Sequence, residues 1–194
     1  DAVVTLDVDN PYSISVGGFG KHYARWREEQ QTAAEEAGKI IVEVGDEFDR
    51  IFGRHYGGLV EEYRCDGAEA VLVAMGAFTG TAREVVDEMR DEGKNVGLVK
   101  VRAFRPFPVE PLRKVISSVK AAAVLDRDCS WGYEGALATD LKAALYGLPN
   151  PPAILNFIGG LGGADVPPER MKYMLEKALA AGRGTTPHLE FIDR

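Results

Sequence analysis

The spacing of hydrophobic and polar residues changes once along the chain. Over about 21–53, apolar residues recur at steps of three and four with Glu, Arg and Gln between them. This period predicts one long amphipathic helix, or two helices joined near Gly38 or Gly45. At about 1.5 Å per residue such a helix reaches roughly 50 Å. Because a compact neighbouring domain does not need that length, we expect the helix to pack across a second domain or chain.

From residue 66 onward the pattern predicts an α/β domain. Continuous apolar runs, typical of strands buried on both faces, alternate with amphipathic segments of helical length. The expected strands are 69–75, 96–101, 121–125 and 153–158, and the expected helices are 81–92, 108–118, 135–146 and 167–181. We therefore expect an open, mostly parallel sheet with helices on both faces over 66–182, preceded by the long helical segment. Residues 183–194 are interpreted as a tail or linker.

Composition and charge argue against two classes of partner. The 23 Lys and Arg are interspersed with 30 Asp and Glu, and the net charge is −7, which disfavours nucleic acid. No apolar run approaches the roughly 18 residues that a membrane-spanning helix needs. The sequence starts at Asp1, without an initiator Met or a secretory signal, so we expect part of the protein upstream to be absent.

The two cysteines do not indicate a metal centre. Cys65 and Cys129 belong to no CxxC motif and have no His close by, so this chain alone cannot build a zinc site or an iron–sulfur cluster. Two free thiols in a reducing cytoplasm are favoured over a disulfide. A nucleophilic role for Cys129 has little support without a neighbouring base.

Ligands of open parallel sheets bind beyond the carboxyl ends of the strands, so the strand-to-helix loops are the places to inspect. The loop "MGAFTGTAREV" lacks the Lys of a phosphate-binding loop, and Thr81 with Glu84 matches a capping box instead. The loop "GGLGGADVPPER" could receive an anion at a helix N-terminus. However, Asp165 is placed to accept from those amides, so close packing against a neighbour is preferred.

Two further loops carry the candidate site residues, all as partner contacts. In "RAFRPFP", Pro106 and Pro108 restrict the turn, and its arginines either clamp a phosphate or carboxylate or pair with acids across an interface. The interface is favoured because Arg and aromatic residues are enriched there. In "DRDCSWGYEG", two acids bracket an arginine, but too few oxygens converge for a metal or for acid–base work. The candidates are Arg102, Phe104, Arg105, Phe107, Asp126, Arg127, Asp128 and Trp131.

Four blocks of the sequence resemble a known family. They are "FGRHYGGLVEEYR", "AVLVAMGAFTGTAREVVDEMRDEGKNVGLVKVRAFRPFPVEPLR", "AVLDRDCSWGYEGALATDLKAALY" and "NFIGGLGGADVPPERM". From about Asp7 to about Leu179 the chain resembles the C-terminal half of the α chain of the 2-oxoacid:ferredoxin oxidoreductases, most closely pyruvate:ferredoxin oxidoreductase (pyruvate synthase). The resemblance implies that 66–182 is a transketolase-C-terminal-like domain. It also implies that 1–65 is the end of a preceding pyrimidine-binding domain with a long linking helix.

The resemblance also implies a reaction and its cofactors. In that family thiamine diphosphate attacks a 2-oxoacid, carbon dioxide leaves, electrons pass through iron–sulfur clusters to ferredoxin, and the acyl group goes to coenzyme A. The complex is expected to use thiamine diphosphate, Mg²⁺, [4Fe-4S] clusters and coenzyme A, and to contain β, γ and ferredoxin-like δ subunits in the cytoplasm. The family's cofactor and metal motifs match no position here. No catalytic, cofactor-binding or metal-binding residue is therefore assigned.

Within such an enzyme the segment is expected to have a structural and assembly role. The stiff Arg-Phe-Pro turn and the Asp-Arg-Asp loop are then docking surfaces, and an arginine there would also suit a phosphate of coenzyme A. Two alternatives stay open. One is an autonomous α/β module that binds a nucleotide or coenzyme A, which calorimetry would test. The other is the C-terminal domain of a different thiamine enzyme, a 2-oxoacid dehydrogenase β chain or transketolase, whose native partner would carry no cluster.

Overall fold

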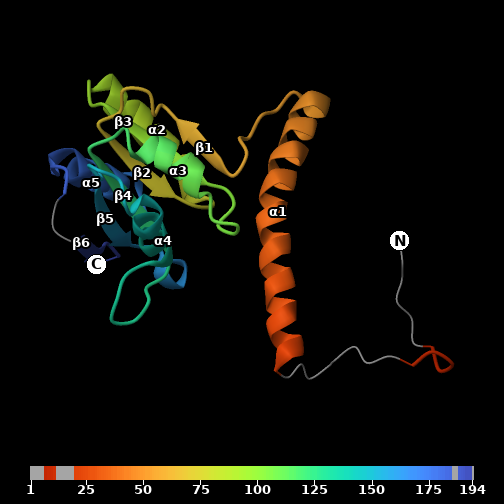
Figure 1. Cartoon of the computed structure of the whole chain (residues 1–194). Helices are drawn as coiled ribbons and strands as arrows, with labels where there is room; N and C mark the ends of the chain where they lie inside the picture. The colour runs from red at the N-terminus through yellow and green to blue at the C-terminus, as the bar shows by residue number, and fades with distance from the viewer. Residues whose placement is uncertain (1–6, 12–19, 185–187, 194) are drawn as a thin grey trace.

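The computed structural model describes residues 7–11, 20–184 and 188–193. Within these ranges it consists of one long helix, α1 (Lys21–Phe52), and an α/β domain beside it (Figure 1). The predicted fold class is confirmed: a mostly parallel sheet with helices on both faces follows a long helical segment.

The sheet of the α/β domain has six strands in the order β1-β3-β2-β4-β5-β6. Only β1 is antiparallel to its neighbour, and the other pairs are parallel. The strands are β1 (Val60–Tyr63), β2 (Ala70–Ala74), β3 (Val96–Val101), β4 (Ala121–Asp126), β5 (Ala153–Ile158) and β6 (His188–Phe191). Residues of β2 and β4 are buried throughout, as expected for central strands covered on both faces.

Two helical layers cover the sheet and divide its core. Apolar side chains of α2 and α5 pack on one face with Leu72 and Phe157, and those of α3 and α4 pack on the other with Val71 and Val73. The two faces alternate along β2 because successive side chains of a strand point to opposite sides. The helices are α2 (Phe78–Asp91), α3 (Val109–Ile116), α4 (Ala136–Leu145) and α5 (Pro168–Ala180), with a short 3₁₀ turn at Leu161–Gly163.

Helix α1 is continuous through both glycines at which a break was considered. It ends at Gly53, whose positive φ of 64° closes the last turn with an N–H bond to the Asp49 carbonyl. Gly38 is the one buried residue of α1, and a Cβ at this position would lie 3.1 Å from Cγ of Pro106. The helix therefore meets the α/β domain at the Arg-Phe-Pro turn, through a residue without a side chain.

Strands β1 and β6 were not predicted. They border the sheet, and charged residues interrupt their short apolar patterns, so neither produces a continuous hydrophobic run. Both lie outside the range 66–182, and β6 pairs with β5 within the segment interpreted as a tail or linker. The sheet is thus wider than predicted, whereas the division of the chain into domains stays a prediction.

One predicted helix start and two predicted helix caps are wrong, whereas α5 begins within one residue of its predicted start. Helix α2 begins at Phe78, before the expected Thr81, and no side chain caps its N-terminus. The hydroxyl of Thr79 instead donates to the Gly76 carbonyl over 2.8 Å. Helix α5 has Pro167 as its N-terminal flanking residue, again without a side-chain cap, so Asp165 is not the cap acceptor. A proline at the first turn needs fewer partners because its missing N–H is one of those that a helix start leaves unpaired.

Candidate functional site

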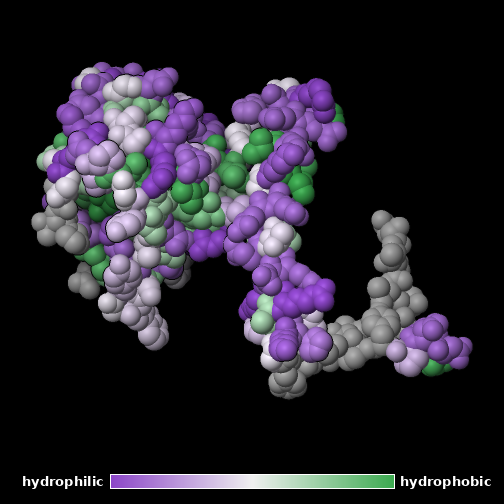
Figure 2. Space-filling model, in the orientation of Figure 1, coloured by the Kyte–Doolittle hydropathy of each residue, from purple (hydrophilic) through white to green (hydrophobic). Residues whose placement is uncertain are grey.

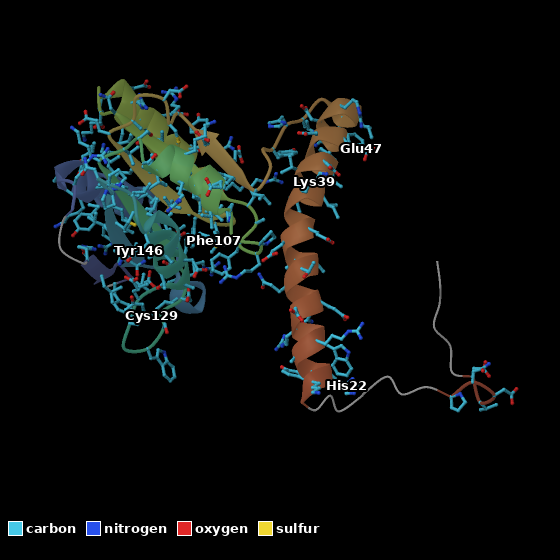
Figure 3. All side chains as sticks on the ribbon, in the orientation of Figure 1. His22, Lys39, Glu47, Phe107, Cys129 and Tyr146 are labelled. Atoms are coloured by element: carbon cyan, nitrogen blue, oxygen red, sulfur yellow. The ribbon has the colours of Figure 1, made fainter. Side chains whose placement is uncertain are left out.

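The strand-to-helix loops lie at the carboxyl edge of the parallel strands. Those after β3 and β4 carry seven of the eight predicted site residues, the eighth, Asp126, is the last residue of β4, and the loop after β3 reaches α1. In Figure 3 the side chain of Phe107 lies on the side of the domain that faces α1, and Cys129 lies on the loop that extends from the lower edge. The eight residues therefore belong to two separate parts of this edge.

The Arg-Phe-Pro turn is held together by its own rings and one arginine. The rings of Phe104 and Phe107 meet edge to face with centroids 5.9 Å apart, and both pack partly buried against the core under α3 and α4. The guanidinium of Arg105 lies 4.2 Å from the Phe104 ring centroid and forms a 2.7 Å ion pair with Asp140 of α4. The turn is therefore a rigid feature whose arginine already has partners within the chain.

Arg102 connects the same turn to the segment that follows α1. Its guanidinium donates to the carbonyls of Gly57 and Gly58 and lies over the Tyr56 ring, 5.9 Å from the centroid. Its backbone N–H donates to the Leu59 carbonyl over 2.9 Å. An apolar groove of about 510 Å³ opens here between the turn and the helix; it is lined by Ile40, Ile41, Val44, Gly45, Phe48, Tyr56 and Arg102.

A buried carboxylate anchors the loop after β4. Asp126 has no exposed surface and accepts hydrogen bonds from the backbone N–H groups of Leu137 (2.8 Å) and Ala138 (3.1 Å) at the start of α4. The side-chain amide of Asn156 on β5 donates to it over 2.8 Å and accepts from the Gly135 N–H over 2.9 Å. Burial raises the pKa of Asp126 to about 6.

Position 135, beside Asp126, has room only for glycine. A Cβ at Gly135 would lie 2.2 Å from Cγ of Asp126, well inside van der Waals contact. The anchor thus fixes the direction in which the loop leaves and re-enters the sheet. The carboxylate of Asp126 faces inward and has no surface to offer a partner, so it takes no part in the docking surface proposed below.

The outer part of the same loop presents an aromatic side chain to solvent. The N–H of Ser130 donates to the Glu134 carbonyl (3.0 Å) and that of Tyr133 to the Ser130 carbonyl (2.8 Å), which closes a turn around Trp131. Trp131 is 98% exposed. At the base of the loop, Asp128 accepts from the Ala136 N–H over 3.3 Å. A bulky ring is therefore held outward by an ordered turn.

Two backbone donors of the last loop are paired with a carboxylate of the chain itself. Asp193, after β6, accepts from the N–H groups of Gly160 (2.9 Å) and Leu161 (3.0 Å). Arg127 donates to the Gly160 carbonyl at 3.2 and 3.3 Å and lies over the Phe78 ring. These two amides are thus already paired with a carboxylate and are not free to bind an anion.

Residues 7–11, 20–184 and 188–193 form no cluster suited to metal binding, and the buried thiol of Cys65 is disfavoured as a nucleophile. The structure groups no three His, Cys, Asp or Glu side chains of these residues around a point where a metal ion could bind. Cys65 and Cys129 are both free thiols, and burial raises the pKa of Cys65 to about 11, which disfavours its nucleophilic form. Of the helices described, none is both long and apolar enough to cross a bilayer.

Comparison with known proteins decides the family. Residues 68–171, more than half of the chain, match the family described as pyruvate:ferredoxin oxidoreductase core domain II. The chain belongs to this family. The chain is 42% identical over 183 residues to the pyruvate synthase subunit PorA of Methanothermobacter thermautotrophicus. This alignment covers 94% of the chain and 46% of the relative.

Further relatives differ in the acid named. Ketoisovalerate oxidoreductase subunit VorA of Pyrococcus abyssi is 41% identical over 180 residues, covering 91% of this chain and 46% of the relative. A solved 2-oxoglutarate:ferredoxin oxidoreductase of Magnetococcus marinus shares the fold, with a TM-score of 0.51 at 19% identity, over 64% of this chain and 20% of that one. The core domain II chain thus spans about half the length of the curated relatives it matches.

The geometry sorts the predicted site residues into groups. Arg102, Phe104, Arg105 and Phe107 lie together beside α1, whereas Arg127, Asp128 and Trp131 lie on the loop after β4 and Asp126 is interior. Sequence reasoning missed Asn156, Tyr56, Asp140 and Asp193, which pair with these groups. A polar Asn within the apolar run 153–158 was the one visible signal among them.

Proposed function

We propose that this chain is part of the α subunit of a thiamine-diphosphate-dependent 2-oxoacid:ferredoxin oxidoreductase, with pyruvate as its 2-oxoacid. The enzyme interconverts pyruvate, coenzyme A and oxidised ferredoxin with acetyl-coenzyme A, carbon dioxide and reduced ferredoxin, and works in the cytoplasm with β, γ and ferredoxin-like δ subunits. The family membership and the 42% identity to a pyruvate synthase subunit carry this proposal.

Within the enzyme, the proposed role of the chain is assembly rather than catalysis. The supporting observation is that its strand-end side chains are engaged with one another: Arg105 with Asp140 and two rings, Arg127 with Gly160 and Phe78. A catalytic acid or base must itself be free to exchange a proton with a reactant. The exposed faces of the Arg-Phe-Pro turn and of the Trp131 loop are the surfaces offered to partner subunits.

The cofactors of the complex are proposed to lie on other parts of it. The residues described here do not fit thiamine diphosphate with Mg²⁺, because the amides of Gly160 and Leu161 are already held by Asp193 and no oxygen-ligand set is present among them. They do not fit a [4Fe-4S] cluster either, since the chain has two cysteines and such a cluster takes about four thiolates. No catalytic step is therefore assigned to these residues.

The activity is tested on the native complex that contains this chain. Purified complex should reduce ferredoxin when pyruvate and coenzyme A are both present, and should do so more slowly with 2-oxoisovalerate or 2-oxoglutarate. A preference for 2-oxoisovalerate would overturn the choice of acid, which the similarity to VorA makes a necessary control. A complex that reduces ferredoxin with none of the three acids would overturn the proposed reaction.

The assembly role is tested by Arg102→Gln and Arg105→Gln in the same complex. If these arginines support assembly, the yield of complex falls while kcat and the KM for coenzyme A of the assembled fraction stay unchanged. If they bind a phosphate of coenzyme A, assembly is normal and the KM for coenzyme A rises, by about tenfold for one lost charge-assisted contact. Lys120→Gln, which removes an exposed cation at the opposite edge of the sheet, serves as the control.

A further inference from the structure

Helix α1 is long and has little packing of its own. Of its residues, Lys21–Phe52, only Gly38 is buried. Helices in proteins gain most of their stability from packing an apolar face, yet Ile40 and Val44 are each 56% exposed and Ile51 is 61% exposed. Figure 1 shows that α1 stands beside the α/β domain and that its N-terminal end projects past the lower edge of the domain. The helix therefore offers an apolar face that nothing in the described structure covers.

Apolar residues along one face of α1 follow a heptad pattern. They occupy two rows of seven-residue spacing, offset by three or four residues: Trp26, Ala33 and Ile40 in one row, and Ala37, Val44 and Ile51 in the other. This alternation of three- and four-residue steps is the seam by which one helix of a coiled coil packs on another. Gln30 and Glu47 take the two remaining positions. We name the six apolar residues the α1 seam.

The α1 seam adjoins the apolar groove beside the Arg-Phe-Pro turn. Ile40 and Val44 belong to both, and the groove continues across Phe48 to Tyr56 and Arg102. Figure 2 shows hydrophobic residues gathered on the upper part of α1, next to the α/β domain. A second helix lying along the seam would therefore bury the groove as well, and would contact both α1 and the α/β domain.

Charge beside the seam restricts what the second helix can be. Glu29, Glu36 and Glu43 repeat every seven residues and flank the seam on the side away from the domain, and all three are exposed. Two of them pair with exposed cations of α1 itself, Arg25 at 2.8 Å and Lys39 at 3.7 Å, which are contacts of small energy. The row is therefore available to cations of a partner.

A second copy of this chain complements that row only in part. In an antiparallel pair Glu36 and Glu43 of the two helices would face each other, and these like charges oppose pairing, while Arg50, the next residue of the row, would face Glu29. In a parallel pair the acidic row would face Ala34, Ile41 and Phe48, and the one cation of that side, Arg27, lies a heptad earlier, outside the reach of Glu29. The complementary helix instead has an apolar heptad seam with Lys or Arg along one flank.

We propose that the α1 seam docks a helix from the portion of the α subunit that lies outside this chain's match to its relatives. This portion is more than half of the PorA relative, of which the chain covers 46%, so enough polypeptide exists to supply it. The docked helix carries apolar residues at heptad spacing and a basic row that faces Glu29, Glu36 and Glu43. The proposal rests on the proposed function, because that assigns the chain to the α subunit.

Site-specific photo-crosslinking in the native complex tests the occupant. A benzophenone amino acid at Ile40 should crosslink to a basic, heptad-patterned segment of the α subunit outside these 194 residues. The same probe at Val42, an apolar residue on another face of α1 that is 38% exposed, should give no such product. Crosslinks from position 40 to a β, γ or δ subunit, to a second copy, or to nothing would each overturn the proposal.

A charge reversal tests the complementarity. Changing Glu29, Glu36 and Glu43 together to Lys should lower the recovery of complete complex at least about tenfold, as expected for a loss of about one to two favourable charge contacts. Changing Glu28, Glu35 and Asp46 to Lys alters the net charge equally on the opposite face of α1 and should leave recovery unchanged. Circular dichroism of both purified 194-residue variants checks that each folds. Equal recovery of the two triple variants would overturn the basic-row assignment.

The outcomes are independent of those that test the reaction. A complex that oxidises pyruvate but crosslinks Ile40 to another subunit keeps the proposed function and loses the docking proposal. A complex without 2-oxoacid activity, but with the expected crosslink, loses the proposed reaction while the helix pairing stands.

Discussion

The α/β domain buries its apolar residues, whereas helix α1 exposes residues of the same types. In the domain, Val and Leu of the central strands are covered by helices on both sheet faces, and residues such as Leu72 and Phe157 have no exposed surface. In α1, Ile40, Val44 and Ile51 are more than half exposed. Apolar surface removed from water stabilises a fold by about 25 cal/mol per Å². The domain gains this energy within the chain, whereas the apolar side chains of α1 gain little of it in the described structure.

The difference separates two kinds of sequence requirement. Core positions of the α/β domain are constrained by this chain's own packing, and substitutions there act on folding. In our proposal the α1 seam and the Trp131 loop contact other parts of the complex, so we expect substitutions there to act on assembly. This contrast can be measured. Truncation of a core side chain should lower the stability of the chain, whereas truncation of a seam or loop side chain should lower the recovery of the complex.

The largest effect is expected in the core. Phe157→Ala removes a fully buried ring of β5 that packs against Tyr173 and His188, and should lower the free energy of unfolding by about 3–5 kcal/mol. Ile51→Ala, on the exposed seam, should change it by less than about 0.5 kcal/mol in the same 194-residue chain. Urea titration measures both. Equal effects would remove the distinction between the two regions.

The next effect concerns the buried anchor and depends on pH. Because the pKa of Asp126 is about 6 in the folded chain and close to 3.8 in the unfolded one, the folded state binds the extra proton between these values. Its contribution to stability is therefore full below about pH 4 and is lost as the pH rises through about 6, by at most about 3 kcal/mol.

Asp126→Asn isolates this contribution, since its side chain does not titrate. The difference in free energy of unfolding, original minus variant, should fall as the pH is raised from about 4 to about 6 and then level off. Urea titrations at several pH values would measure it. A difference that rises over this window would mean that the hydrogen bonds to the carboxylate outweigh its burial.

A smaller effect is expected at the Arg-Phe-Pro turn. Arg105→Gln removes the ion pair with Asp140 and the contact with the Phe104 ring. The Arg105 side chain is 60% exposed, so we expect a loss of no more than about 1 kcal/mol in the isolated chain. A double-mutant cycle with Asp140→Asn measures the coupling. A coupling well above that value would place this turn with the core rather than with the docking surfaces.

The smallest effect on folding is expected at the tip of the loop after β4. Trp131→Ala should change the free energy of unfolding by less than about 0.5 kcal/mol, because the ring is 98% exposed. In the complex the same change should weaken assembly by about 2 kcal/mol or more, as for other buried aromatic anchors. Thermal denaturation of the chain and quantification of the assembled complex provide the two readings. An unaffected complex would exclude Trp131 from the interface.

The sequence predicted the buried elements better than the polar ones. Strands β2 to β5 and the alternation of helices follow from continuous apolar runs, whose burial depends on few details. Strands β1 and β6 were missed because an edge strand is half exposed and its pattern is short and mixed. The start of α2 and the caps of α2 and α5 were wrong because cap motifs such as Thr81 with Glu84 compete with other local hydrogen bonds.

The candidate site was predicted in position but not in its internal pairing. Rings and arginines at strand ends could be read from "RAFRPFP" and "DRDCSWGYEG". Their partners come from distant segments, such as Asp140 on α4, Asn156 on β5 and Asp193 after β6. Such pairs depend on tertiary structure, so a single sequence did not reveal that Asp126 faces inward.

The lock between Asp126 and Gly135 also sets where related chains are free to differ. Both ends of the intervening loop are tied to the sheet by contacts that leave no space for a methyl group at Gly135. The exposed tip of the loop, at Trp131, lies between these ties, so we expect substitutions or insertions there to leave the strands undisturbed. We therefore expect related chains to vary at the tip of this loop, where a different partner could be contacted, while Asp126, Gly135 and the strands keep their arrangement.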